Sequence, residues 1–263
     1  RDFVPFFQGE VNQTVVSAQG LLTKPGQGQL VTRGANISLY QLRDASQGED
    51  LYLDVEGFLR SKGRETKAYH HELERVGIQE SSPQNNFRRI IACRIPKGRF
   101  CNHKINYTTA GHARIPLELV LFVLNSSFAD WFFRLGSTNA AVSHYQLGNI
   151  PCPRFESGSE AAPAFDAAIR AALDARDFEQ VERSLIASAN GPARGDVQAG
   201  IAALVRFIER QELSRGQIAR TARSRLSPDG ERAQQVLDKT MLALLGIDTT
   251  RSAFIAQRLS EML

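Results

Sequence analysis

Hydrophobic and polar positions follow two different patterns along this chain of 263 residues, and the change falls near residue 155. Before it, short β-branched runs predominate. Residues Gln29 to Leu42 alternate around Gly34, which predicts a strand, a turn and a second strand. Phe87 to Ile95 predicts another strand, and Arg99 to Tyr107 can return as its hairpin partner after a turn at Pro96 to Gly98.

The most apolar segment, Leu117 to Leu135, predicts one long helix that is buried on nearly every face. Pro116 suits its first turn, where the missing N–H would be unpaired in any case. Gly136 suits its C-terminal cap. Three charged residues within the segment argue against a membrane span.

A linker is indicated at Phe155 to Pro163 by its glycine, serine and proline content. Beyond it, apolar residues recur at spacings of three and four, and Ser227 followed by Pro228 is typical of a helix start. Four helices are predicted, over residues 164–176, 178–189, 196–210 and 231–245. The expected fold class is therefore α+β: a mixed domain with a short β-sheet and a long buried helix over residues 1–154, then a helical domain over residues 155–263.

Charge adds one asymmetry to this division. Residues 1–153 contain 17 Lys and Arg against 13 Asp and Glu, whereas residues 154–263 contain 15 of each. All five histidines, all five tyrosines and Trp131 also lie in the first part. A basic, aromatic half is compatible with a polyanionic partner. Three scattered cysteines favour a reducing, cytoplasmic location.

Methionine occurs only at positions 241 and 262, and the first residue is Arg1. We therefore expect this chain to be a segment of a longer protein.

Candidate chemistry is sparse. Cys93, Cys101, His103 and His112 do not have the spacing of a zinc finger or ribbon. The chain contains no phosphate-binding loop, dinucleotide fingerprint or nucleophile elbow. No catalytic residue, metal or cofactor is therefore expected within the segment.

Two alternatives remain open. Asp54, Glu65 and Lys67 formally match the D…ExK pattern of Mg²⁺-dependent nucleases, in which two carboxylates hold the metal. That chemistry normally places the Glu and Lys on a strand, and the polar context here equally fits a solvated basic loop. The helical half could instead make the chain a protein-interaction module.

Basic, amide and histidine side chains on predicted turns, strand ends and loops provide a third possibility. Arg and Lys can bind guanine edges or phosphates, and Asn can bind adenine. Each position is also compatible with an ordinary solvated residue. The candidate DNA-binding residues are Arg33, Asn36, Arg60, Lys62, Arg64, Lys67, Arg88, Lys97, Lys104, Asn139 and His144.

Four blocks of residues, in order, then point to a family. They are GEVNQT from Gly9, LVTRGANISLYQL with SQGEDLYLD up to Asp54, RRIIACRIPKG with NHKINY up to Tyr107, and LVLFVLNSSFADWFFRL with LGNIPCP up to Pro153. Together they resemble the C-terminal specificity region of type IIG restriction–modification enzymes and related adenine-specific DNA methyltransferases. Cys152 departs from the family, which usually has an aliphatic residue there.

The resemblance implies a target-recognition domain whose partner is double-stranded DNA. It also implies an N-terminal methyltransferase domain of the parent chain, outside this segment, which would bind AdoMet and modify a flipped base. The polar loop from Gly136 to Gly148 would face the DNA or the neighbouring domain. Residues 60–67 and 97–104 would position the DNA backbone, and Arg33, Asn36, Asn139 and His144 would reach base edges.

Overall fold

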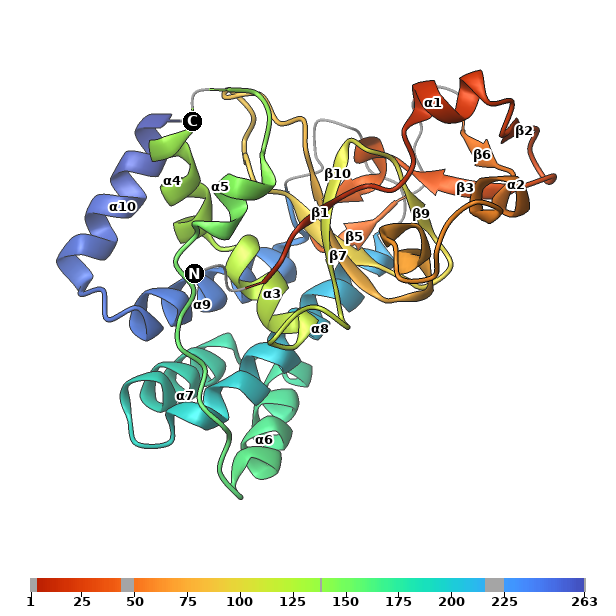
Figure 1. The fold of residues 1–263 in the computed structure, drawn as a ribbon. Helices are drawn as coiled ribbons and strands as arrows, with labels where there is room; N and C mark the ends of the chain where they lie inside the picture. Colours follow the sequence, from red (N-terminus) through yellow and green to blue (C-terminus); the bar gives the residue numbers. More distant parts are fainter. Residues whose placement is uncertain (1–3, 44–49, 138, 216–224, 263) are drawn as a thin grey trace.

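The computed structural model describes residues 4–43, 50–137, 139–215 and 225–262 (Figure 1). Its central sheet has four strands in the order β1-β10-β7-β8, and each neighbouring pair is antiparallel. The strands are β1 (Phe7–Gln8), β10 (Ile105–Thr109), β7 (Arg75–Gln79) and β8 (Ala92–Ile95).

The predicted hairpin between residues 87–95 and 99–107 is wrong, because β7 lies between β8 and β10. Strand β7 was not predicted from the sequence. Its middle residue is Gly77, and glycine weakens the pattern of a strand. A Cβ at this position would lie 2.3 Å from Ile95 Cδ1, so any larger residue would require the Ile95 side chain to shift.

A small lobe projects from this sheet and carries its own sheet, in the order β2-β6-β3-β9 (Figure 1, right). Val16, Leu53, Phe58 and Phe100 are among the side chains of its separate core. The lobe comprises α1 (Gln13–Ala18), β2 (Leu22–Thr23), β3 (Gln29–Thr32), β6 (Tyr52–Leu53), α2 (Val55–Leu59) and β9 (Phe100–Cys101).

The predicted strand, turn and strand over residues 29–42 exist, but the two strands do not pair with each other. After β3 the chain forms the short 3-10 helix η1 (Gly34–Asn36), and β4 (Ile37–Ser38) then pairs with β5 (Gln41–Leu42). β3 pairs with β6 and, in parallel, with β9. This segment therefore connects the small lobe to the main body.

The long buried helix is broken into α3 (Leu117–Leu124) and α4 (Ser127–Gly136), which meet at an angle of 59°. At the break, Asn125 Oδ1 accepts a hydrogen bond from Ala92 N at 3.1 Å, and Asn125 Nδ2 donates to Ala92 O at 3.0 Å. Ser126 Oγ caps α4 by accepting from Ala129 N at 3.0 Å. The expectation of one continuous helix was wrong because Asn125 binds the edge of a strand.

None of the helices in the described parts of the chain is, by itself, long and apolar enough to span a membrane. α3 and α4 satisfy the criteria of length and composition only as a bent pair.

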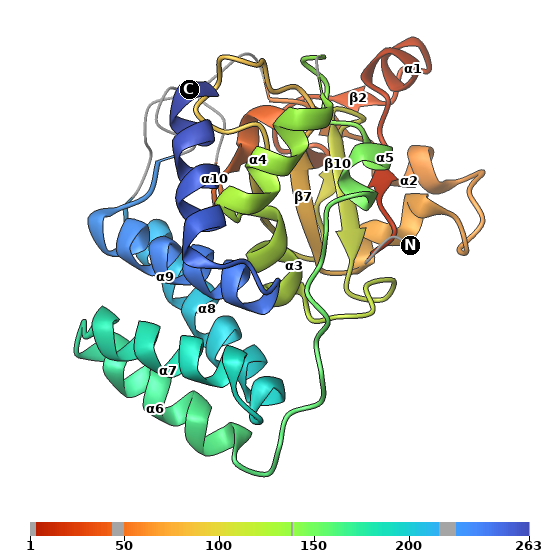
Figure 2. The same cartoon turned by 90° about the vertical axis from the view of Figure 1, so that its left-hand side faces the viewer.

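All four predicted helices of the second half are present: α6 (Ala162–Asp174), α7 (Phe178–Asn190), α8 (Val197–Ser214) and α9 (Pro228–Leu244). Ser227 caps α9, as its sequence suggested, by accepting from Gly230 N at 3.1 Å. A further helix, α10 (Thr249–Met262), was not predicted and lies alongside α4 (Figure 2). Short helical turns elsewhere are η2 (Lys67–Glu72), α5 (His144–Gly148) and η3 (Arg194–Asp196).

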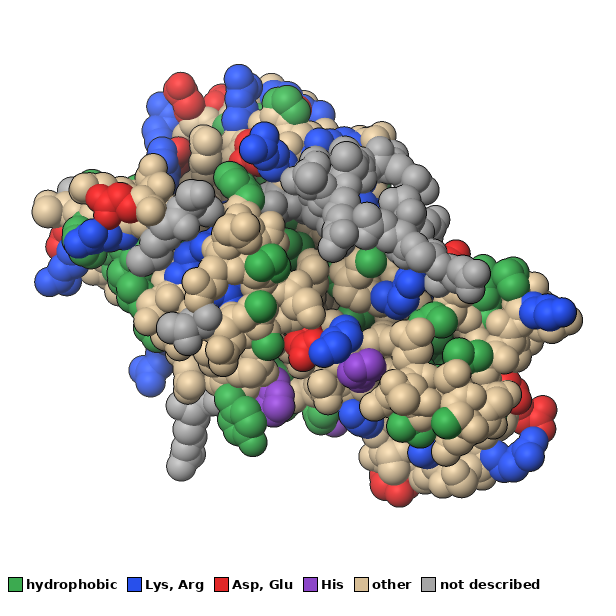
Figure 3. Space-filling model, turned by 90° about the horizontal axis from the view of Figure 1, so that it is seen from above, with side chains coloured by type: hydrophobic (Ala, Val, Ile, Leu, Met, Phe, Trp, Pro, Cys, Tyr) green, Lys and Arg blue, Asp and Glu red, His purple; other side chains and the backbone are tan. Residues whose placement is uncertain are grey.

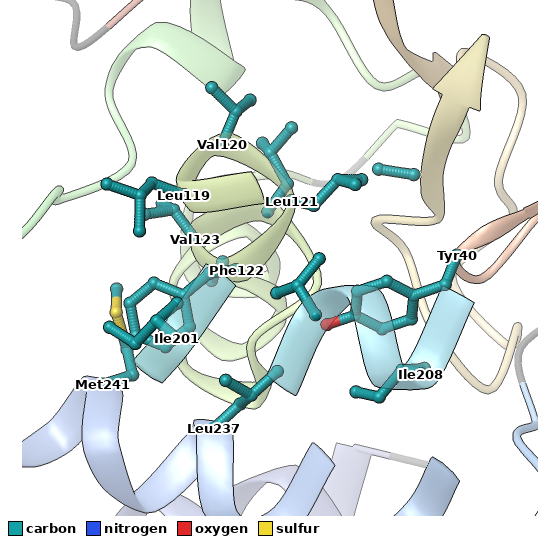
Figure 4. Close-up of a cluster of buried hydrophobic side chains, with 14 of the residues drawn as sticks. Tyr40, Leu119, Val120, Leu121, Phe122, Val123, Ile201, Ile208, Leu237 and Met241 are labelled. Carbon is teal, nitrogen blue, oxygen red and sulfur yellow. The ribbon is translucent and has the colours of Figure 1, made fainter. Parts of the chain in front are cut away.

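One hydrophobic core joins the two parts of the chain. Phe122 of α3 packs with Ile201 of α8 and Met241 of α9 (Figure 4). Polar contacts cross the same junction: Asp238 accepts from Ser127 N at 2.7 Å and from Ser127 Oγ at 2.6 Å. The α+β class is confirmed, and the helical bundle is packed directly against the sheet-bearing part.

A buried histidine makes the stability of this fold dependent on pH. His70 Nδ1 lies 3.0 Å from the Tyr107 hydroxyl, and its ring centroid lies 4.9 Å from that of His112. Burial, followed by the charges of His112, Arg75 and Lys67, lowers the pKa of His70 to about 4. The folded protein therefore keeps this imidazole neutral.

We expect the free energy of unfolding to fall as the pH drops from about 6.5 to about 4. Over this range His70 becomes protonated in the unfolded chain but stays neutral in the folded protein. This difference should lower the free energy of unfolding by about 1–3 kcal/mol. Urea unfolding at pH 7.5 and pH 5 measures the difference. The His70→Gln variant should lose less stability on acidification, and an equal loss in both proteins would contradict this assignment.

Candidate nucleic-acid interface

Four loops meet at the end of the central sheet where β7 ends and β10 begins. Gln79 pairs with Ile105 at this end, so the loops that follow and precede these residues are adjacent. Ser81 forms a β-bridge with Ala141, and Val142 N donates to Glu80 O at 2.7 Å. We call residues 33–36, 80–87, 102–104 and 139–144 the loop face.

The segment around η1 completes the loop face. A Cβ on Gly34 would lie 3.3 Å from Lys104 O, so the segments around residues 34 and 104 are in close contact. Any larger residue at position 34 would press on the loop before β10. The absence of a side chain therefore allows residues far apart in the sequence to share one surface.

Buried arginines fix the main chain of these loops. The Arg89 guanidinium donates to the carbonyl oxygens of Ser137 and Asn139. Arg134 donates to Gln84 O at 2.9 Å and Asn86 O at 2.8 Å. Two loops are thus held by charge-assisted hydrogen bonds before any ligand binds.

The exposed chemistry of the loop face is mixed. Lys104 Nζ pairs with Glu80 Oε2 at 3.1 Å. His144 and Tyr145 form an exposed aromatic pair with ring centroids 4.4 Å apart, and Tyr145 is 77% exposed. Viewed from above, this side of the molecule is largely uncharged, with basic side chains in separate groups and histidines among them (Figure 3). Such a surface offers hydrogen bonds and ring stacking without strong non-specific charge.

Five of the sequence candidates lie on the loop face: Arg33, Asn36, Lys104, Asn139 and His144. The last three are exposed. Arg33 is partly buried and pairs with Asp50 at 3.8 Å.

The structure corrects the prediction that Asn36 binds DNA, because this residue is only 6% exposed. Its Oδ1 accepts from Arg33 N at 2.7 Å, and its Nδ2 donates to Arg43 O at 2.8 Å. Both ends of the amide shape the loop, so Asn36 is not positioned to contact a base.

Five other candidates lie on the small lobe and its border. Arg60 lies 4.0 Å from Glu56, and the Arg64 guanidinium lies 3.4 Å from Glu72. Both are strongly exposed, and surface pairs of this kind leave the cation available to a stronger anion. Lys62 and Lys97 are also exposed, and Lys67 Nζ donates to Gln8 O at 3.0 Å.

Arg88 is the second correction. It is buried, donating to Asn125 O at 2.7 Å and to Ser127 Oγ at 3.2 Å. Its guanidinium therefore holds the break between α3 and α4 and does not reach the surface. In the sequence Arg88 resembles an exposed strand-end arginine, because its hydrogen-bond partners lie 37 and 39 residues away.

The nuclease and zinc alternatives gain no support from the geometry. Asp54 Oδ1 caps α2 by accepting from Gly57 N at 3.0 Å, and the Glu65 carboxylate folds back against Gly63. Cys93 and Cys101 are buried, and burial raises the pKa of both thiols. No group of three or more His, Cys, Asp and Glu residues within the described ranges could hold a metal ion.

Tyr145 was not among the sequence candidates, although a local signal existed. Ser143 and Gln146 form a reciprocal capping box, in which Ser143 Oγ accepts from Gln146 N at 3.3 Å. The S-x-x-Q spacing is a known helix-start signature, so it could have placed His144 and Tyr145 in an exposed first turn.

The fold and the loop face together define a mixed α+β protein with polar loops at one end of its sheet and a helical bundle packed against its other elements. Among solved structures, this chain is similar to the type IIL restriction–modification enzyme MmeI in complex with DNA. The match has a TM-score of 0.54 and 11% sequence identity, and covers 100% of this chain and 36% of that one.

The likeness shows a shared fold, and the chain spans about a third of the length of that enzyme. No protein-family model and no curated protein sequence matches the chain.

Proposed function

We propose that this chain is the double-stranded DNA recognition module of a restriction–modification enzyme. The observation that carries the proposal is the convergence of loops around residues 34, 81, 104 and 141 on one face. The fold shared with a restriction–modification enzyme that was solved on DNA supports it.

In this proposal the module selects a site and does not catalyse. An adenine-specific methyltransferase domain elsewhere in the parent protein would bind AdoMet and modify the base, in the cytoplasm. The finer family assignment, to type IIG enzymes, rests on the four sequence blocks alone. Glu10 in the first block and Asn125 in the last both have structural roles in this fold.

The module would use its two exposed regions differently. Arg60, Lys62 and Arg64 on the small lobe, with Lys104, would contact phosphates and position the duplex. Arg33, Asn139 and His144 would approach base edges, and Tyr145 adds an exposed aromatic ring beside them.

Binding to duplex DNA should fall steeply with salt. With about 4–6 phosphates contacted, log K should decrease with log salt at a slope of about −4 to −5. Fluorescence anisotropy against random-sequence duplex, single-stranded DNA and RNA measures both the slope and the preference. The proposal is contradicted if the full-length parent binds duplex no better than the other two at low salt.

Single substitutions should separate positioning from recognition. Lys104→Ala should weaken duplex binding uniformly across sequences and reduce the salt slope by about 1. Tyr145→Ala should weaken binding with little change in slope, because it removes no charge. Arg183→Ala is the matched control, since Arg183 is an exposed arginine on α7, far from the loop face. Equal effects in all three variants would assign the binding to overall charge and not to this face.

A further inference from the structure

A pocket of about 530 Å³ lies between β5, the end of β8 and helix α8. Arg94 and Pro96 mark its position at the end of the sheet where Arg75 pairs with Ile95. The loop face lies at the other end, where Gln79 pairs with Ile105. The pocket is therefore separate from the loop face.

Four arginines line the pocket, and they fall into two kinds. Arg94 is held by three carboxylates, the nearest being Glu209 at 2.9 Å, and Arg206 is held by Glu118 at 2.9 Å. Arg99 and Arg210 have side chains with no hydrogen-bond or ion-pair partner among the described residues. Two guanidiniums thus remain for an anion, and their planar donors suit phosphate oxygens.

An unsatisfied acceptor lies in the same pocket. Gln41 is 7% exposed, and its Oε1 is buried without a hydrogen-bond partner in the described structure. Buried polar atoms are normally paired, so this oxygen is suited to accept from a donor on a ligand. The preceding residue, Tyr40, has a φ of 61°, which is rare for an aromatic residue. Tyr40 is the second residue of the two-residue turn that joins β4 and β5, in which Ser38 pairs with Gln41, and this turn places Gln41 at the pocket.

The remaining lining is apolar. Leu42 and Pro96 border the cavity, and Leu213 is 65% exposed at its rim. The volume is within the range of about 300–1,000 Å³ for small-molecule sites. A fitting ligand therefore combines an anionic group, a hydrogen-bond donor and a flat apolar body.

We propose that this pocket binds a purine mononucleotide. Its phosphate would pair with Arg99 and Arg210, its base would lie against Pro96 and Leu213, and its amino group would donate to Gln41. A glutamine amide is suited to the amino edge of adenine. The site would give the module a small-molecule ligand that is independent of duplex binding.

Isothermal titration of the chain with AMP and with inorganic phosphate tests the proposal. AMP should bind more tightly than phosphate alone. Arg99→Gln combined with Arg210→Gln should weaken AMP binding at least about tenfold, since each lost charge-assisted hydrogen bond has an effect of that order. Gln41→Leu should weaken AMP binding but leave phosphate binding unchanged. Arg183→Gln, on α7, is the matched control and should bind AMP like the wild type.

Further arms identify the source of the ligand and separate the two sites. If a 5′-phosphorylated dinucleotide binds as tightly as AMP and depends on Arg99, the pocket takes strand ends; if only AMP binds, it takes free nucleotide. Lys104→Ala should leave AMP binding unchanged, and Arg210→Gln alone, on α8, should leave duplex affinity unchanged. The proposal is overturned if AMP does not bind, or if the double arginine variant binds it like Arg183→Gln.

Discussion

Replacing Arg75 with methionine is expected to lower the free energy of unfolding by about 3–5 kcal/mol at pH 7. Arg75 and Glu10 form a fully buried ion pair, with Nη1 and Oε1 3.0 Å apart and both side chains at most 1% exposed. Glu10 Oε1 also accepts from Cys101 N at 3.0 Å, which ties the start of the chain to β9. Without the Arg75 guanidinium, the Glu10 carboxylate stays buried without the opposite charge that offsets its loss of hydration.

Chemical denaturation with urea measures this loss, and pH gives a second test. Burial already raises the pKa of Glu10 despite the nearby guanidinium. Removing Arg75 raises that pKa further, so the deficit of the variant should shrink as the pH falls towards 5 and the carboxyl takes up a proton. Adding Glu10→Gln to Arg75→Met should recover part of the stability.

The matched control is Arg64→Met, which breaks the exposed pair with Glu72. Its effect should be below about 1 kcal/mol, because exposed ion pairs contribute little. If Arg75→Met lowered the free energy of unfolding by no more than Arg64→Met does, the buried pair of Arg75 and Glu10 would not be a main source of stability.

The second large effect is expected at the break between α3 and α4. Asn125→Ala should lower the free energy of unfolding by about 2–4 kcal/mol, because it leaves the N–H of Ala92 unpaired in the core and removes one of the two donors to the Ala92 carbonyl, the other being Tyr40 N. Asn125 is 0% exposed, and its own carbonyl accepts from Arg88 and from Gln234 of α9. The residue therefore connects β8, the helix pair and the bundle.

Urea unfolding of Asn125→Ala against Asn149→Ala measures this effect. Asn149 is exposed and its side chain has no hydrogen-bond partner among the described residues, so its replacement should cost less than about 0.5 kcal/mol. Equal stabilities of the two variants would contradict the role assigned to Asn125. If only Asn125→Ala lowers the free energy of unfolding, the Leu-Asn-Ser sequence at residues 124–126 has a structural role, whatever the protein binds.

Local signals in the sequence were sufficient to predict helices α6 to α9 of the second half, but α10 was not predicted. Ser227 and Pro228 start α9 because a hydroxyl cap and a missing N–H act within one helical turn. The apolar spacing that predicted α8 is likewise local, since residues three and four apart share one helix face. Elements of this kind need no knowledge of distant residues.

Strand pairing and burial depended on contacts far along the chain. β7 separates the two strands of the predicted hairpin, and no local pattern shows which strands become neighbours. Asn125 resembles a residue within a helix until Ala92, 33 positions away, binds both ends of its amide. Arg88 and Lys104 look alike in sequence, yet one is buried under α4 and the other is exposed.

The sequence by itself determined helices α6 to α9 and the α+β class, because these follow from composition and short-range spacing. Only the tertiary structure decided the loop face and the pocket. Lys104, Asn139 and His144 share a surface because β7, β10 and the chain after α4 meet at one end of the sheet. Arg99 and Arg210 share a cavity because α8 packs beside β5. Proximity of this kind is set by long-range packing, which no short stretch of residues encodes.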